Sequence, residues 1–295
     1  MIETVTTRAN PLVDPTLSVW GWEIPVYLFL GGWVAGMMVL SGWYLVQGRQ
    51  AQRRCVCFVL PAVGLVLLSV GMLALFLDLE HKLHVWRLYV TVKPLSPMSW
   101  GAWILMLVYP VLLASTFLRR AGWSERTVRG LGLLSLGLGV ALGIYTGVLL
   151  STLVARPLWT SALLAPLFLL SGMSAGAAFA HLVARDEQER EQLARADNRF
   201  LLAELAAIFL FVVGLATSGQ AERAAAALLL GGPLTAVFWV LVVGLGVVLP
   251  LGIQALAVAH RIRHTPVAPA LVLAGGLALR FVIVYGGQMS GWPRG

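Results

Sequence analysis

Eight continuously apolar stretches constrain the fold of this chain more than any other feature, because each is long enough to cross a hydrocarbon core of about 30 Å as a helix. The runs lack the apolar-polar alternation of a barrel strand, so they predict helices. A charged fraction of 12%, about half that of an ordinary soluble domain, excludes a soluble fold. The predicted membrane helices cover residues 21–47, 56–78, 99–118, 130–154, 160–183, 200–218, 229–259 and 267–286.

These helices predict an all-α integral membrane protein built from two four-helix bundles. The run 229–259 is longer than one membrane thickness requires, which predicts a tilted helix or a break near Pro250. The expected divisions are an N-terminal segment at 1–20, a first bundle at 21–154, the fifth helix with a charged connection at 155–199, and the remaining helices at 200–295.

Basic residues in the connections predict the orientation of the chain. Thirteen of them lie in the connections after the first, third, fifth and seventh helices, and seven lie on the opposite side. Because cytoplasmic loops carry the excess of basic residues, both termini are predicted to lie outside, in the periplasm, with the protein in a bacterial inner membrane. The net charge of +8 arises from these loops, so it does not indicate nucleic-acid binding.

Two short segments in different halves of the chain share the pattern Gly-x-x-Ala-Gly. They are GWVAG at residues 32–36 and GMSAG at residues 172–176, in helices that are expected to run in the same direction. A parallel duplication of four helices would explain the match. Small residues four positions apart also let helices approach closely, and that requirement alone explains it equally well.

Ionisable residues near the outer ends of the first helices are candidate functional residues, since a charge at mid-bilayer costs about 2.5–3.5 kcal/mol. Glu23 opens the first helix, and Asp78 closes the second. His81 follows Asp78 after one helical turn, on the same helical face. Tyr145 lies in the outer half of the fourth helix, and Arg156 follows that helix. We expect these side chains to converge just below the outer surface.

Such a site suits a quinone, whose apolar ring carries two carbonyl oxygens and whose reduction takes up two protons. Its pocket needs aromatic walls, hydrogen-bond partners and a titratable group. Trp22, with Trp20, Trp86, Trp100 and Trp159 at a similar level, would supply walls. Alternatively, the tryptophans form an interfacial belt, Asp78 pairs with Lys82, and Tyr145 only packs between helices.

Haem and metal ions are not expected in this chain. Ligation by two histidines requires both at one depth, and His181 and His260 come closest, yet each lies within four residues of an arginine in an inner connection. Cys55 and Cys57 form a lone CxC pair, too few for a zinc site or an iron–sulfur cluster, and are predicted to be packing residues.

Glu204 and Arg280 are ionisable residues of the second half. Glu204 is expected one turn inside the inner boundary, and Arg280 roughly 20 Å higher, too far for a simple ion pair. Either they line a polar path for protons across the second bundle, or Glu204 reaches the inner surface beside Arg199.

Five segments in the first five helices resemble the NrfD family of membrane subunits, over about residues 20–180 and in the same order. The last three helices are matched only by length and topology. The segments are IPVYLFLGGWVAG, LDLEHKLHVWRLY, PLSPMSWGAWIL, YTGVLLS and ARPLWTSALLAPLFLLSGMSAG. The resemblance implies an eight-helix protein without haem that binds a quinone, either menaquinone or ubiquinone, near the periplasmic face. It also implies a periplasmic ferredoxin-like iron–sulfur subunit and, commonly, a molybdenum-containing or multihaem catalytic subunit.

By position in these segments, Tyr145 matches the family's quinone-side tyrosine and Asp78 its acidic residue at the end of the second helix. Glu23 lies where the best-understood member has Asn and His, which leaves the quinone type and the direction of electron flow open. We therefore predict a quinone-reactive subunit of a respiratory oxidoreductase. Glu23 would contact the quinone or exchange protons beside it, with Asp78 or His81 leading to water. A secondary transporter, a proton-translocating module and a passive anchor are the alternatives.

Overall fold

The computed structural model describes residues 20–49, 55–79, 82–84, 86–90, 93, 96–121, 123–153, 155–261, 263 and 265–291. Every regular element within these ranges is a helix. Eight of the described helices are long and apolar enough to cross a membrane. The prediction of an all-α protein with eight membrane-spanning helices is therefore confirmed, whereas the side on which the termini lie stays a prediction.

The eight candidate spans follow the predicted order. They are α1 (Glu23–Val46), η2 with α2 (Val56–Phe58 and Val59–Asp78), α4 (Pro97–Ala121), α5 (Glu125–Ser151), α6 (Leu164–Val183), α7 (Glu187–Thr217), the π-helix η5 with α9 (Val237–Val248 and Leu249–Val258), and α10 (Val267–Met289). The shorter elements are η3 (Lys82–His84), α3 (Arg87–Val90), η4 (Pro157–Trp159) and α8 (Gln220–Leu230).

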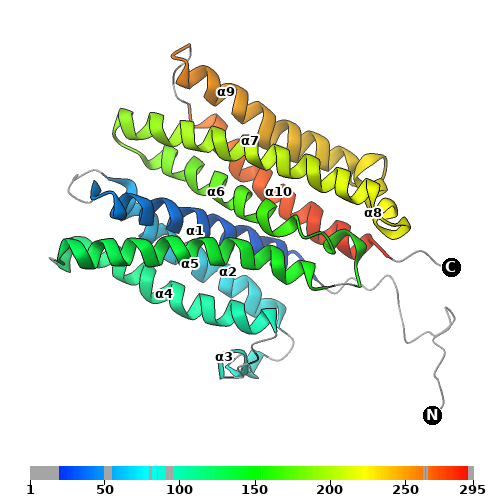
Figure 1. Ribbon diagram of the computed structural model, residues 1–295, viewed down its shortest axis with the longest axis horizontal. Helices are drawn as coiled ribbons and strands as arrows, with labels where there is room; N and C mark the ends of the chain where they lie inside the picture. The colour runs from blue at the N-terminus through cyan, green and yellow to red at the C-terminus, as the bar shows by residue number, and fades with distance from the viewer. Residues whose placement is uncertain are drawn as a thin grey trace.

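The long helices lie side by side in two groups, with α1, α2, α4 and α5 in the lower part of Figure 1 and α6, α7, α9 and α10 in the upper part. Helix α1 packs against α2 and α5 of its own group and against α6 and α10 of the other. The main-chain N–H of Trp20 donates to Gln288 Oε1 at 2.9 Å, so the described chain starts and finishes at the same end of the molecule. We call this the terminal end, and the other the opposite end.

Glycines bring α1 and α6 into direct backbone contact. A Cβ atom at Gly172 of α6 would lie 2.5 Å from the carbonyl oxygen of Gly32, and a Cβ at Gly176 would lie 2.5 Å from the carbonyl carbon of Gly36. The two Gly-x-x-Ala-Gly segments of the sequence therefore pack against each other. Close approach explains why both helices need small residues here, and the duplication stays a prediction.

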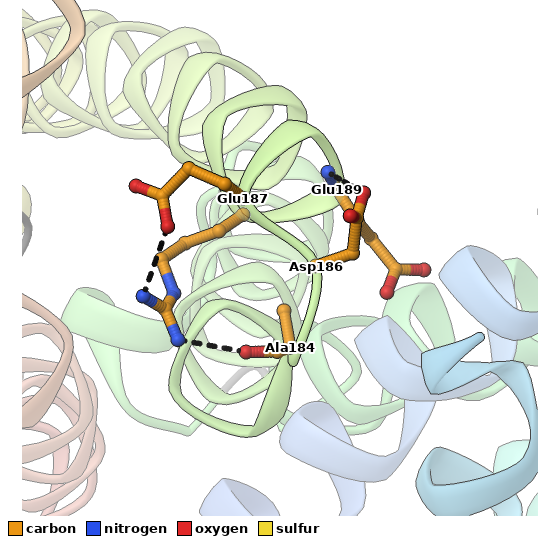
Figure 2. Close-up of polar contacts among 5 residues, drawn as sticks. Ala184, Asp186, Glu187 and Glu189 are labelled. Atoms are coloured by element: carbon orange, nitrogen blue, oxygen red, sulfur yellow. Dashed lines mark hydrogen bonds and ion pairs between the residues drawn. The ribbon is translucent and has the colours of Figure 1, made fainter. Parts of the chain in front are cut away.

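The sixth membrane helix, α7, begins at Glu187 rather than near residue 200, because its first turns are capped and rich in helix-forming residues. Asp186 precedes the helix, and its Oδ2 accepts a hydrogen bond from the main-chain N–H of Glu189 at 3.1 Å (Figure 2). Arg190 Nη2 donates to the carbonyl oxygen of Ala184 at 2.9 Å. The predicted charged connection is thus largely helical, and α6 and α7 are joined by a tight turn.

The run 229–259, for which a tilted helix or a break near Pro250 was predicted, is interrupted near its start instead. Helix α8 ends at Leu230, and the chain turns through Gly231, Gly232 and Pro233 before the next long helix starts. That helix continues through Pro250, where π-helical hydrogen bonding has just given way to α-helical. The altered bonding pattern next to the proline accommodates its missing N–H.

The two cysteines lie at the start of η2, at the opposite end of the molecule. Both Cys55 and Cys57 are buried, as the prediction of packing residues requires. Their Sγ atoms also form a disulfide, which the sequence pattern did not predict.

Candidate functional site

A cleft of about 510 Å³ lies at the terminal end, enclosed by α1 to α5. Its walls are mainly aliphatic and aromatic, with side chains such as Met72 and Leu75 of α2 and Leu105 of α4. Three tyrosines, Tyr27, Tyr89 and Tyr145, also line it. An apolar cleft with a few hydroxyl groups is the usual form of a site for a mostly apolar small molecule.

The cleft opens sideways between α2 and α4. Leu73 of α2 and Met98 of α4 line it, yet 57% and 61% of their surfaces are exposed. Phe76 of α2 is also exposed and lines the same cleft. In a helix of a membrane protein, such exposed apolar side chains face lipid tails. A ligand dissolved in the membrane would therefore enter this cleft from the lipid.

The three tyrosines supply the polar atoms of the cleft. Tyr27 and Tyr145 are buried, and the Tyr27 phenol lies near those of Tyr145 and Tyr89. Tyr89 lies on α3, outside the membrane-spanning helices, and its partial burial raises the pKa of its phenol. This hydroxyl therefore keeps its proton at neutral pH and remains a hydrogen-bond donor.

Gly101 of α4 sets the position of Tyr145. A Cβ atom at Gly101 would overlap Cζ and the hydroxyl oxygen of Tyr145, so the phenol packs directly on the α4 backbone. Both residues line the cleft. The location of Tyr145 in the predicted site thus depends on a glycine in a neighbouring helix.

Glu23 and Asp78 lie near each other at the ends of α1 and α2, close enough to interact electrostatically. Both are half-buried, and neither lines the cleft. Glu23 precedes Tyr27 by one turn on the same face of α1, and Asp78 precedes the lining residue Leu79. The two carboxyl groups are therefore neighbours of the cleft rather than walls of it. Among the described residues, Asp78 forms no ion pair with Lys82.

Other predicted site residues lie away from the cleft or cannot be placed. Trp22 is exposed and does not line it. Arg156 Nη1 donates to the carbonyl oxygens of Gln288 at 2.9 Å and Ser290 at 3.2 Å, so it joins the α5–α6 connection to the end of α10. His81 lies outside the described residues. The predicted tryptophan walls are replaced by tyrosines, because none of the five tryptophans lines the cleft.

Sequence reasoning missed Tyr27 and Tyr89, since it searched for ionisable groups that are costly in a membrane. The available signal for Tyr27 was its spacing of four residues from Glu23, which places both on one helical face. Tyr89 stands at the end of the segment LDLEHKLHVWRLY that carries Asp78.

A second polar region lies among α6, α7, α9 and α10. Glu204 and Arg280 are both buried there, so the expectation that Glu204 reaches the inner surface beside Arg199 is wrong. The two groups interact electrostatically, although they do not form a close ion pair. Asp197, which sequence reasoning also missed, accepts hydrogen bonds of 2.7 Å from Ser174 Oγ and from Gln254 Nε2.

The histidines at the opposite end do not form a matched pair. His181 is buried, whereas the side chain of His260 is 78% exposed and lies 3.8 Å from Glu191 Oε1. Within the described ranges, no three His, Cys, Asp or Glu side chains gather as a metal site would require.

Comparison with known proteins gives matches over almost the whole sequence. A family model described as "Polysulphide reductase, NrfD" matches residues 8–290. The C subunit of polysulfide reductase from Wolinella succinogenes is 31% identical over 307 residues, covering 92% of this chain and 94% of the relative. Protein NrfD of Escherichia coli K12 is 32% identical over 309 residues, covering 92% and 96%. Both alignments extend beyond the first five helices, where the sequence motifs lie.

Proposed function

Because the chain belongs to the NrfD family, which makes it a multi-pass membrane subunit of a respiratory oxidoreductase, we propose that it exchanges electrons with a membrane quinone pool. The observation that carries this proposal is the cleft at the terminal end. It combines an apolar interior, tyrosine hydroxyls and a mouth between α2 and α4. The terminal end faces the periplasm in this proposal, in agreement with the excess of arginines at the other end.

The shape of the cleft fits the chemistry of a quinone. The ring enters from the lipid between Leu73 and Met98, and the isoprenoid tail stays among the lipid tails. The carbonyl oxygens accept hydrogen bonds, which the phenols of Tyr145, Tyr27 and Tyr89 donate. Menaquinone and ubiquinone share these features, so either quinone fits.

Proton exchange is assigned to the carboxyl groups beside the cleft. Reduction of a quinone to a quinol takes up two electrons and two protons, and oxidation releases them. Glu23 lies one turn from Tyr27, and Asp78 lies beside it at the end of α2. Both are partly exposed at the terminal end, so they connect the cleft with water. His81 extends this connection in the proposal.

Electrons arrive from, or leave to, a partner with an iron–sulfur cluster. The name of the Wolinella relative indicates one chain of a larger reductase. A periplasmic ferredoxin-like subunit would dock at the terminal end, where α3 carries the exposed Val90 and Trp86 precedes it. A molybdenum-containing or multihaem catalytic subunit would complete the electron path in anaerobic respiration.

Replacement of Tyr145 by phenylalanine tests the assignment of the cleft. Loss of one hydrogen bond of about 0.5–1.5 kcal/mol should weaken quinone binding by about 2- to 12-fold. Titration of the purified complex with a quinone, followed by tryptophan fluorescence, measures the affinity. Tyr285→Phe, in α10 where Tyr285 stacks on Phe281, is the matched control and should bind normally. Equal affinities of wild type and Tyr145→Phe would remove Tyr145 from the site.

A Glu23→Gln variant tests the proton role separately from binding. Glutamine keeps the size of the side chain but cannot transfer a proton, so quinone-linked turnover should fall by about 100-fold with little change in quinone affinity. Steady-state kinetics give kcat and KM for the variant. Glu222→Gln, a half-buried carboxylate of α8, serves as the control. A folded Glu23→Gln complex with full turnover would contradict an essential role.

A further inference from the structure

A charged cavity of about 580 Å³ lies at the opposite end of the molecule, between the start of α7 and the end of α9. It is separate from the cleft proposed for the quinone, which lies at the terminal end. Three arginines, a histidine and two glutamates line the cavity, namely Arg190, Arg261, Arg263, His260, Glu187 and Glu191. A cavity with several guanidinium groups is a candidate binding site for an anion.

Both carboxylates of the cavity are already paired with arginines of the same helix. These ion pairs are Arg190 with Glu187, whose Nη1 and Oε2 atoms lie 3.4 Å apart (Figure 2), and Arg195 with Glu191. Within the described ranges, the side chains of Arg261 and Arg263 form no hydrogen bond or ion pair. The cavity therefore keeps an excess of positive charge, which these two arginines carry.

A backbone turn after α9 directs these two arginines to the cavity. His260 has a φ of 54°, a left-handed conformation that glycine usually supplies at the end of a helix. The main-chain N–H of Arg261 donates to the carbonyl oxygen of Leu256 at 2.9 Å, so the chain folds back over the last turn of α9. The imidazole Nε2 of His260 lies 3.8 Å from Glu191 Oε1 of α7. The turn thus lies against α7, with Arg261 and Arg263 both lining the cavity.

Apolar side chains beside the cavity face the lipid. Leu256 directly precedes the lining residue Ala257 and is 49% exposed. A smaller cavity of about 140 Å³ is adjacent, since Arg190 lines both cavities. Leu182 of α6 lines the smaller cavity and is also exposed. Exposed apolar side chains of membrane helices contact lipid tails, so an occupant of this region meets cationic groups and an apolar surface together.

The cavity lies at the level of the lipid headgroups. The membrane-spanning helix that ends at Val258 has 22 residues, and α10, which begins at Val267, has 23. At 1.5 Å per residue, these helices are about 33–35 Å long, slightly more than a hydrocarbon core of about 30 Å. Their ends therefore lie just outside the hydrocarbon core, and the connection between them, which contributes Arg261 and Arg263, lies among the headgroups.

We propose that this cavity binds the phosphate group of an anionic phospholipid. Arg261 and Arg263 donate charge-assisted hydrogen bonds to the phosphate oxygens, and the acyl chains lie along Leu256 and Leu182. A zwitterionic lipid also carries a phosphate, but its ammonium group is repelled by the excess positive charge, so lipids with a net negative charge are preferred. The bound lipid joins α7 to the connection that follows α9. This inference goes beyond the proposed quinone reaction and does not depend on it.

Titration of the purified complex with phosphatidylglycerol in a neutral detergent, followed by native mass spectrometry, tests the site. Phosphatidylcholine with the same acyl chains should bind about tenfold more weakly or worse. An arginine at the membrane surface contributes about fivefold to the affinity for an anionic lipid, so the double variant Arg261→Gln/Arg263→Gln should lose about 30-fold. The matched control is Arg126→Gln/Arg129→Gln, which removes two exposed arginines near the start of α5, at the same end of the molecule. It should bind as wild type does.

Three results would overturn the lipid site. The first is equal affinity of the wild type for phosphatidylglycerol and phosphatidylcholine, a comparison that holds even if a variant fails to assemble. The second is an equal loss of affinity in both double variants, because binding would then follow the net charge of this end rather than the cavity. The third is displacement of phosphatidylglycerol by inorganic phosphate at the same concentration, which would assign the cavity to a soluble anion.

Discussion

Replacement of Gly172 by leucine is expected to prevent stable assembly of the two helix groups. The new side chain would meet the backbone of α1 at Gly32, where no flexible side chain can move aside. Overpacking of a tight interface usually lowers the free energy of unfolding by about 1–3 kcal/mol. Because the new side chain meets backbone here, we expect a loss at or above the upper limit. The complex should be recovered in low yield and with a markedly lower thermal unfolding midpoint in detergent.

The matched control for this variant is Gly137→Leu. Gly137 is an exposed glycine of α5 with no atom within 4 Å of its Cβ position, so the same leucine would face lipid. It should fold and melt as wild type does. An unchanged unfolding midpoint of Gly172→Leu would show that α1 and α6 do not approach as closely as described.

Gly101→Ala is expected to abolish most quinone-linked activity without unfolding the protein. A single methyl group at this position occupies the space of the Tyr145 phenol, so the ring must leave its place on α4. Misplacement of a reacting group by about 1 Å can cost about 100-fold in rate, and we expect a loss of this size in turnover. Thermal unfolding should change little, because alanine favours the helix more than glycine does.

A double-mutant cycle shows whether Gly101→Ala acts through Tyr145. The change Tyr145→Phe should weaken quinone binding in the wild-type background but have a much smaller effect once Gly101→Ala has displaced the ring. Gly130→Ala, at an α5 glycine with open space around its Cβ position, should retain full activity. Equal effects of Tyr145→Phe in both backgrounds would show that Gly101→Ala damages the site by another route.

The eight spans were predictable because the hydrocarbon core imposes one rule on the whole sequence, namely about 20 apolar residues per crossing. This rule did not predict the residue at which α7 begins. Residues 187–199 are charged and resemble a loop in composition, yet the Asp186 cap and helix-forming residues make them helical. Asp197 was overlooked for the same reason. Only its spacing of seven residues from Glu204 indicated that both lie on one buried face.

The candidate site could be predicted in part where a polar aromatic residue follows a long apolar stretch, as Tyr145 does in α5. It was not predictable where several helices contribute one apolar side chain each. Leu73 of α2 and Met98 of α4 look like ordinary lipid-facing residues in the sequence, and only packing shows that they flank a cleft. The dependence of Tyr145 on Gly101 likewise arises between helices, so no local pattern reveals it.

Helix α1 touches both polar regions of the molecule. Its first turns carry Tyr27 into the cleft at the terminal end, and Gly32, little more than one turn later, lies against Arg280. Closely packed helices shift as rigid bodies between discrete arrangements rather than deform continuously. If a change of ligand beside Tyr27 makes α1 slide, the same movement displaces the backbone against which the guanidinium of Arg280 packs. Helix α1 would then couple the two halves mechanically, although they share no ligand.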